Sequence, residues 1–274
     1  MAVVAFQGEY GAYGEEAIRS RFGAESTPLP CKSFADTFAA VVGGAAEFGA
    51  VPVENSQAGS INDVYDLLRS HDLHVVGEIC HPVDHCLMAL PGQELGAITR
   101  VISHPQALAQ VDAYLRRLGV EVVATYDTAG SAKLIREQGL QGVAAVASAR
   151  AAERYGLTIL ARSIQTVPEN ITRFVVLNRE KGSRAEGPAK TMLMLGVAHQ
   201  PGALYHALGA LAQRQINLLK LESRPSRNRP WEYMFYLDFE GDQADPPVAA
   251  ALSEISGYAS FCKVLGSFAR DLHR

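Results

Sequence analysis

Residues 48–60 read Phe48-Gly-Ala-Val-Pro-Val53-Glu54-Asn55-Ser56-Gln-Ala-Gly59-Ser60, and this stretch decides the fold class of the chain. Its first six residues form a short, mostly apolar run that is typical of a buried strand. Residues 60–70 follow with apolar side chains at helical spacing. A strand that passes through a small polar junction into a helix is the building unit of α/β domains.

The same unit repeats over the first 180 residues. We expect strands at 3–6, 48–53, 74–79, 100–103, 120–125, 143–147 and 173–177. Helical patterns lie between several of them, near 14–22, 33–46, 60–70, 105–118, 128–138 and 148–155. This alternation predicts an α/β domain whose strands are largely parallel.

A polar segment at 179–188, with two glycines and a proline, has the composition of a linker. The pattern after it predicts strands at 191–198, 217–222, 231–239 and 259–266, with helices at 201–215 and 246–255. The order βαββαβ is the ferredoxin-like arrangement. We therefore expect one domain at about 1–180 and a second at about 190–274.

The composition argues against several classes of protein. The 274-residue chain has a formal net charge of −4, whereas nucleic-acid binders are usually basic. It contains no apolar stretch long enough to span a membrane. Residues 1–8 lack a basic region and read as a strand and a turn, not as an export signal. A cytoplasmic protein that binds neither nucleic acid nor membrane is expected.

No metal or cofactor motif is evident. The cysteines are few and lack metal-type spacing, which suits a reducing compartment: Cys31, Cys80, Cys86 and Cys262. His81 and His85 have a spacing that binds metal on a helix, but Pro82 intervenes and the segment reads as extended. Glycine-rich phosphate and dinucleotide motifs are also missing.

Four strand-to-helix junctions combine small residues with hydroxyl or amide side chains, at 8–14, 53–60, 103–106 and 127–131. Any one of them could be ordinary helix capping. Together they favour a cleft that receives an anion, because helix N-termini carry free N–H groups and a partial positive charge. Residues 1–179 have a net charge of −5, so attraction of an anion must be local. Arg173 is a candidate because a guanidinium can grip a carboxylate through two hydrogen bonds.

Five motifs occur in order along nearly the whole chain. Three lie in the first domain: Val51–Ser56 continuing through Gly59 to Asp66–Leu68, Ser103–Leu108, and Ile164-Gln165 followed by Asn170–Phe174. Two lie in the second domain, at Gly202–Leu204 and Glu222–Pro225. Together they resemble the motifs of prephenate dehydratases with a C-terminal ACT domain.

The resemblance implies a fold like that of type II periplasmic binding proteins, with two α/β lobes and the active site in the cleft between them. Lobe one would comprise about 1–80 plus 165–179, and lobe two about 81–164. The ACT domain would pair with that of another subunit, in a homodimer or homotetramer, and bind L-phenylalanine as an allosteric effector.

The resemblance also implies a reaction. Prephenate would lose its ring carboxylate as carbon dioxide and its C4 hydroxyl as water, giving phenylpyruvate. Aromatisation drives the step, and the ring electrons themselves expel the hydroxyl, so no cofactor is implied. The protein must orient a dianion and assist a poor leaving group with a proton.

Residue roles follow from the resemblance. Thr172 matches the catalytic threonine and would act on the departing hydroxyl, while Arg173 would hold a carboxylate and Glu54 would tune the site. Asn55, Ser56 and Gln106 would position the ring substituents. Further substrate contacts are expected from Ser103, His104, Phe174, Thr128 and Ser131. The expected effector residues are Gly202, Ala203, Leu204, Asn217, Glu222, Ser223, Arg224 and Pro225.

The chain departs from the family at a few positions. Ala12 and Gly14 stand where hydroxyl residues are typical, so the first junction could contribute only backbone N–H groups. Tyr205 stands where a smaller aliphatic residue is usual in the effector motif.

Two other readings remain open. An arogenate dehydratase would use the same fold and chemistry on the aminated substrate. A non-catalytic sensor would bind an aromatic acid between its lobes and have no special need for Thr172.

Overall fold

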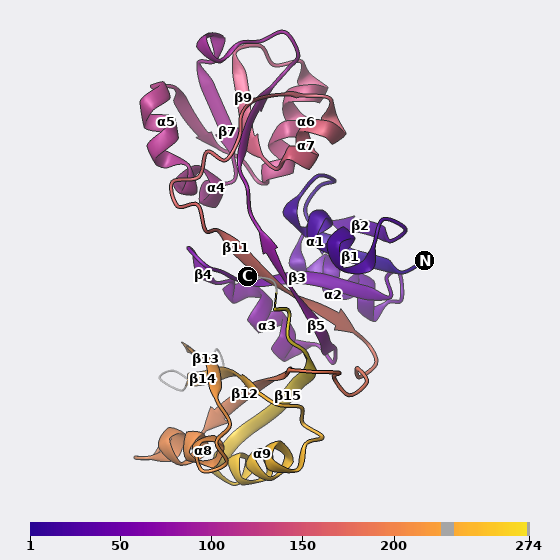
Figure 1. Cartoon of the computed structure of the whole chain (residues 1–274), viewed down its shortest axis with the longest axis vertical. Helices are drawn as coiled ribbons and strands as arrows, with labels where there is room; N and C mark the ends of the chain where they lie inside the picture. The colour runs from indigo at the N-terminus through magenta and orange to yellow at the C-terminus, as the bar shows by residue number, and fades with distance from the viewer. Residues whose placement is uncertain (226–232, 273–274) are drawn as a thin grey trace. The chain divides into compact units, whose positions relative to one another are not determined.

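The computed structural model describes residues 1–225 and 233–272 (Figure 1). The chain divides into two compact units: residues 1–67 with 79–174, and residues 68–78 with 175–274. The strands of the described residues form three sheets, and strands β5 and β11 each contribute residues to both units.

The first sheet has the strand order β2-β1-β3-β11-β5, with β4 paired to β3. β1 pairs in parallel with both β2 and β3. The elements of this part of the chain are β1 (Val3–Gln7), α1 (Tyr13–Phe22), β2 (Thr27–Cys31), α2 (Phe34–Val42), β3 (Phe48–Asn55), β4 (Gly59–Ser60), α3 (Asn62–Ser70), β5 (His74–Pro82) and, much later, β11 (Ile171–Asn178).

The second sheet has the order β10-β6-β9-β7-β8. β7 pairs in parallel with β8 and β9, whereas β6 is antiparallel to β9 and β10. Its elements are β6 (Cys86–Ala89), η1 (Leu95–Ala97), β7 (Arg100–Ser103), α4 (Pro105–Gln110), α5 (Asp112–Leu118), β8 (Glu121–Ala124), α6 (Thr128–Gln138), β9 (Val143–Ala147), α7 (Ala149–Tyr155) and β10 (Thr158–Ala161).

The expected alternation of strands and helices is confirmed, and with it the mixed α/β class. Every strand and helix expected in the first 180 residues is present, although the pattern at 105–118 is divided into α4 and α5. Strands β2, β4, β6 and β10 were not expected. β2 carries Pro28 and Pro30, which weaken a strand pattern; it is an edge strand, where a missing N–H is tolerated.

The third sheet has the order β13-β14-β12-β15, and all its pairs are antiparallel. Its strands are β12 (Ala189–Val197), β13 (Leu218–Pro225), β14 (Tyr233–Glu240) and β15 (Ala259–Ala269). Helices α8 (Ala203–Ala212) and α9 (Pro246–Tyr258) pack side by side against the sheet in one apolar cluster (Figure 1). The βαββαβ prediction is confirmed; Trp231 and Glu232, expected in the third strand, lie outside the described residues.

Within the second unit, β5 is joined to the antiparallel sheet by a buried ion pair. Lys190 Nζ on β12 lies 2.7 Å from Glu78 Oε2 on β5, and the side chains are 10% and 1% exposed. The second carboxylate oxygen of Glu78 accepts the backbone N–H of Asp271. The pairing and the extra hydrogen bond offset the cost of burying both charges.

No helix among the described residues is long and apolar enough to cross a membrane. Across residues 1–225 and 233–272, no group of three or more His, Cys, Asp or Glu side chains is placed to hold a metal ion.

Candidate active site

A cavity of about 460 Å³ lies in the first unit, lined by strands of the first sheet and by the segments that follow β7 and β8 of the second sheet. It is lined by Gln7, Ala12, Tyr13, Gly14, Ser33, Phe34, Ala50, Pro52, Asn55, Ile61, His104, Gln106, Tyr126, Asp127, Thr128, Thr172 and Phe174. The first residues of α1, α2, α4 and α6, or their caps, are all among them. Three of the four polar junctions seen in the sequence thus meet at one cavity together with Asn55 from the fourth.

The positive potential of this cleft comes from helix ends. None of the described lining residues is a lysine or an arginine. Ser33, His104 and Asp127 cap α2, α4 and α6 with side-chain acceptors, whereas Ala12, at the start of α1, has no capping side chain. The first N–H groups of α1 are therefore left for water or a ligand, as is typical of an anion site.

The side chain of Asn55 lies at the centre of a buried hydrogen-bond network. Its Oδ1 accepts the backbone N–H groups of Gln57 and Ala58, each at 3.0 Å. Because an amide oxygen must face these donors, the orientation of the side chain is determined. Its Nδ2 then donates to Thr172 Oγ1 at 3.0 Å and to Asn170 Oδ1 at 2.7 Å. Thr172 accepts at this bond, so its own hydroxyl proton is directed elsewhere.

The orientations of the Asn170 and Gln110 side-chain amides are determined in the same way. Since Asn170 Oδ1 accepts from Asn55, Asn170 Nδ2 is the donor to Gln110 Oε1, at 3.1 Å. Gln110 Nε2 in turn donates to Asn55 Oδ1 at 3.3 Å and closes a ring of three amides. A closed ring of this kind holds each side chain in one orientation.

His85 fixes the far side of the ring. Gln110 Oε1 lies 2.8 Å from His85 Nε2, and an amide oxygen only accepts, so Nε2 carries the proton. Nδ1 is then an acceptor, and the Tyr13 hydroxyl lies 2.8 Å from it and 3.0 Å from the backbone oxygen of Asp84, so its one proton is shared between these two acceptors. Burial lowers the pKa of His85, and burial likewise raises the pKa of Tyr13, which keeps both groups neutral.

We expect the lowered pKa of His85 to make the protein less stable at acid pH. The unfolded chain binds the proton more tightly than the folded one, so stability is highest above about pH 6.5 and falls as the pH drops through that value toward the folded pKa. Denaturant unfolding at about pH 7.5 and about pH 5.5 measures the loss. His85→Gln should lose less stability between the two conditions than the wild type does, and His74→Gln should behave like the wild type. An equal loss in His85→Gln would contradict this origin.

Six of the residues expected to touch substrate line the cleft: Asn55, Gln106, His104, Phe174, Thr128 and Thr172. They come from β3, β11 and the starts of α4 and α6. The structure therefore brings together side chains that are up to 119 residues apart in the sequence.

Arg173 and Glu54 are not among the lining residues. Successive side chains of a strand point to opposite faces, so Thr172 and Phe174 face the cleft while Arg173 faces away from it. Arg173 Nη2 lies 3.3 Å from Glu54 Oε2, and the Arg173 side chain is 11% exposed. In this structure the guanidinium is thus placed against a carboxylate of the protein, not in the cavity.

Three serines with expected roles also lie outside the lining and make bonds within the fold. Ser56 Oγ accepts the N–H of Ile171, Ser103 Oγ donates to Val146 O at 2.6 Å, and Ser131 Oγ donates to Asp127 O at 2.8 Å. Ser103 and Ser131 are fully buried. These contacts hold β11, β7 and the start of α6 in place.

Several site residues were not predicted from the sequence. Gln110 lies one helical turn after Gln106, and that four-residue spacing of two amides was the signal available for it. Tyr13 and Asp127 were visible only as parts of two junctions. His85 was considered as a metal ligand, and nothing in the sequence placed it behind Gln110.

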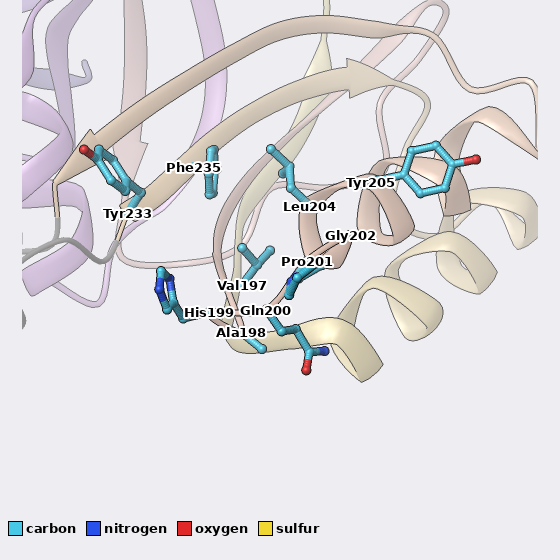
Figure 2. Close-up of a pocket in the computed structure, with 11 residues that line it drawn as sticks. Val197, Ala198, His199, Gln200, Pro201, Gly202, Leu204, Tyr205, Tyr233 and Phe235 are labelled. Carbon is cyan, nitrogen blue, oxygen red and sulfur yellow. The ribbon is translucent and has the colours of Figure 1, made fainter.

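A second cavity, of about 530 Å³, lies in the C-terminal unit (Figure 2). Its lining includes Gly202, Ala203 and Leu204 at the start of α8, together with Tyr233 and Phe235 of β14. The ring of Tyr205 is 75% exposed and lies apart from the other labelled side chains in Figure 2. The remaining expected effector residues are not in the lining: Asn217, Glu222, Ser223, Arg224 and Pro225. Ser223 and Pro225 are register partners of Phe235 and Tyr233.

The chain matches two family models. The model described as prephenate dehydratase covers residues 4–182, and the model described as ACT domain covers residues 191–257. Among curated proteins, the chain is 47% identical to arogenate dehydratase 1 of Petunia hybrida, over 98% of this chain and 67% of the relative. It is 46% identical to the chloroplastic arogenate dehydratase/prephenate dehydratase 6 of Arabidopsis thaliana, over 98% of this chain and 69% of the relative.

Two solved structures are similar over nearly the whole chain. GqqA, described as a novel type of quorum quenching acylase, has a TM-score of 0.90 and 40% identity, with 98% of each chain covered. The prephenate dehydratase of Arthrobacter aurescens, in complex with L-Phe, has a TM-score of 0.88 and 30% identity, with 98% of this chain and 90% of that chain covered.

Proposed function

Since the chain belongs to the prephenate dehydratase family and carries an ACT domain, we propose that it catalyses the decarboxylating dehydration of prephenate or of its aminated form, arogenate. Prephenate would give phenylpyruvate, and arogenate would give phenylalanine. Carbon dioxide and water leave in both cases, and one proton is taken up because a carboxylate charge departs as neutral carbon dioxide. The names of the plant relatives support arogenate as the second candidate substrate.

The hydrogen bond from Asn55 to Thr172 is the observation that carries the proposal. Asn55 Nδ2 donates to Thr172 Oγ1, which leaves the hydroxyl proton of Thr172 for the departing hydroxyl of the substrate. Donation into Oγ1 also polarises the O–H bond, since hydrogen bonds in a chain strengthen one another. A leaving hydroxyl that gains a proton departs as water and not as hydroxide, which lowers the barrier.

The shape of the cleft and the helix ends around it would bind and orient the substrate. The helix N-termini that meet there suit the two carboxylates of the substrate. Phe174 and Pro52 provide apolar wall for the ring. Holding the ring carboxylate and the C4 hydroxyl in one orientation favours concerted loss of both groups.

In this proposal the role of Arg173 differs from the substrate-binding role expected from the motif. Its pairing with Glu54 supports a role in fixing β11, and therefore Thr172, next to β3. Direct grip of a substrate carboxylate by Arg173 stays a prediction.

An acylase reaction like that named for GqqA would need an activated nucleophile. Such a nucleophile is normally hydrogen-bonded to a general base. In the described residues the partner of Thr172 Oγ1 is the amide of Asn55, which is not a base at neutral pH. The site therefore favours proton donation over nucleophilic attack.

The test is turnover. The protein is incubated with prephenate at neutral pH, and the formation of phenylpyruvate is measured. In a parallel assay it is incubated with arogenate, and the formation of phenylalanine is measured. Product from at least one substrate is expected. Binding of either compound without turnover would support a sensor and overturn the enzymatic proposal.

We also propose that L-phenylalanine controls the rate through the cavity at the start of α8. The A. aurescens relative was solved with L-Phe, and the cavity combines an apolar wall with a helix N-terminus for a carboxylate. Pairing of ACT domains in a homodimer or homotetramer is part of this proposal. A rate on prephenate that is unchanged by added phenylalanine would contradict it.

Gly202→Ala should weaken the response to phenylalanine. Gly202 has φ +81°, where a side chain is strained by about 1–2 kcal/mol. A Cβ would also lie 3.2 Å from His206 Nε2. We expect the phenylalanine concentration for half the effect to rise by about 5- to 30-fold, with the rate in the absence of phenylalanine unchanged. Gly209→Ala is the matched control, because nothing lies within 4 Å of its Cβ position. Equal responses in the two variants would remove Gly202 from the effector site.

A further inference from the structure

We propose that Asp127 is a specificity-determining residue that binds the α-ammonium group of the substrate, so that this cleft favours arogenate over prephenate. The inference rests on the proposed function and deepens it. The two candidate substrates differ at one group only, which is a ketone in prephenate and an ammonium in arogenate. A residue that distinguishes them must lie in the cleft and differ in its interaction with a cation and with a carbonyl.

Asp127 is the only acidic side chain among the described residues that line the cleft. It is 8% exposed and stands at the start of α6. Its Oδ1 accepts the N–H of Gly130 at 2.6 Å and caps the helix. Its Oδ2 points to Gly8, where a Cβ would lie only 3.2 Å away. Because residue 8 is a glycine, it places no side chain over this oxygen.

The charge of this carboxylate is not neutralised within the protein. Across the described part of the chain Asp127 forms no ion pair, and the nearby Glu9 is itself paired with Lys133 at 3.0 Å. Burial raises the pKa of Asp127 and the charge of Glu9 adds to this rise, and the N–H groups of Gly130 and Ala129 and the charge of His104 offset it only in part. A buried carboxylate without a cation is costly, and a cation on the ligand would offset the cost.

The chemistry of the two substrates then separates them. An ammonium donates hydrogen bonds and carries a positive charge, so it is attracted to Oδ2. A ketone oxygen only accepts, so an ionised carboxylate facing it is repulsive. The corner thus matches an ammonium group better than a ketone.

The experiment compares kcat/KM for arogenate and prephenate in the whole protein. Asp127→Asn and Asp127→Ser are chosen because both residues remain good helix N-caps, so α6 keeps its cap while the charge is lost. We expect kcat/KM for arogenate to fall about 100-fold, as for loss of one partner of a buried charge pair. For prephenate we expect a change of less than about 3-fold, or a rise, because an amide or hydroxyl can donate to the ketone.

Asp112→Asn is the matched control, since Asp112 begins α5, its side chain is 53% exposed, and it does not line the cleft. Both its kcat/KM values should equal those of the wild type. An equal loss on both substrates in the two Asp127 variants would overturn the inference and indicate a role in proton transfer. Turnover of prephenate alone by the wild-type protein would also overturn it. Turnover of neither substrate would overturn the proposed function itself.

Discussion

Replacing Thr172 with alanine should lower kcat by about 100- to 10,000-fold, the range typical for loss of a general acid or base. The hydroxyl accepts from Asn55 Nδ2 and is therefore set to donate its proton into the cleft. Alanine removes the donor but keeps the β-strand backbone and the cavity wall. KM should change much less than kcat, because the interaction is strongest with the departing hydroxyl in the transition state. Steady-state kinetics on the preferred substrate measure both constants.

Two further variants make this test specific. Thr172→Ser keeps a hydroxyl on the same carbon and should retain far more activity than Thr172→Ala. Thr158→Ala removes an exposed threonine at the start of β10, outside the cleft lining, and should leave the rate unchanged. Normal turnover by Thr172→Ala would remove the catalytic role of this hydroxyl.

Asn55→Asp should be almost as damaging, although it changes only one side-chain atom. The carboxylate can still accept the N–H groups of Gln57 and Ala58. Its second oxygen, however, replaces the donor to Thr172, so the Thr172 hydroxyl turns to donate to the carboxylate. The proton is then no longer directed to the substrate, and we expect kcat to fall about 100-fold or more.

A pH profile distinguishes this effect from simple damage to the fold. Burial raises the pKa of a carboxyl group, and the carboxyl group introduced by Asn55→Asp, once protonated, again has an O–H that can donate to Thr172. The activity of the variant should therefore recover in part as the pH falls. Asn178→Asp is a matched control at the end of β11, because its side-chain oxygen accepts only the N–H of Glu180 among the described contacts. A flat pH profile for Asn55→Asp would show that the lost donor is not the cause.

The resemblance of the sequence to prephenate dehydratases is confirmed by the match of both family models. The α/β class and the βαββαβ order were predictable because apolar spacing depends on local geometry: period two in strands and about 3.6 in helices. β2 was missed because Pro28 and Pro30 disguise a strand that is tolerated only at a sheet edge. Whether a segment lies at an edge is a property of the assembled sheet.

The residues of the candidate site were also only partly predictable from the sequence. The sequence could name the motif that contains Thr172 and Arg173, but it did not say which of the two faces the cleft. Strand alternation places Thr172 inside and Arg173 against Glu54, and this depends on which face of β11 is covered. Gln110 and His85 became site residues only when the chain brought them next to Asn55.

The sequence by itself therefore determined most of the elements, the two-part organisation, the family, and the junctions where an anion could bind. Each of these features depends on residues that are close together in the sequence or on recognisable motifs. The tertiary structure decided which side chains share one cavity and where the acidic Asp127 stands relative to the helix ends. It also decided which atom of each amide and imidazole donates a hydrogen bond and which accepts one. These follow from contacts between residues as much as 117 positions apart, such as Asn55 and Thr172, and no local pattern encodes such a contact.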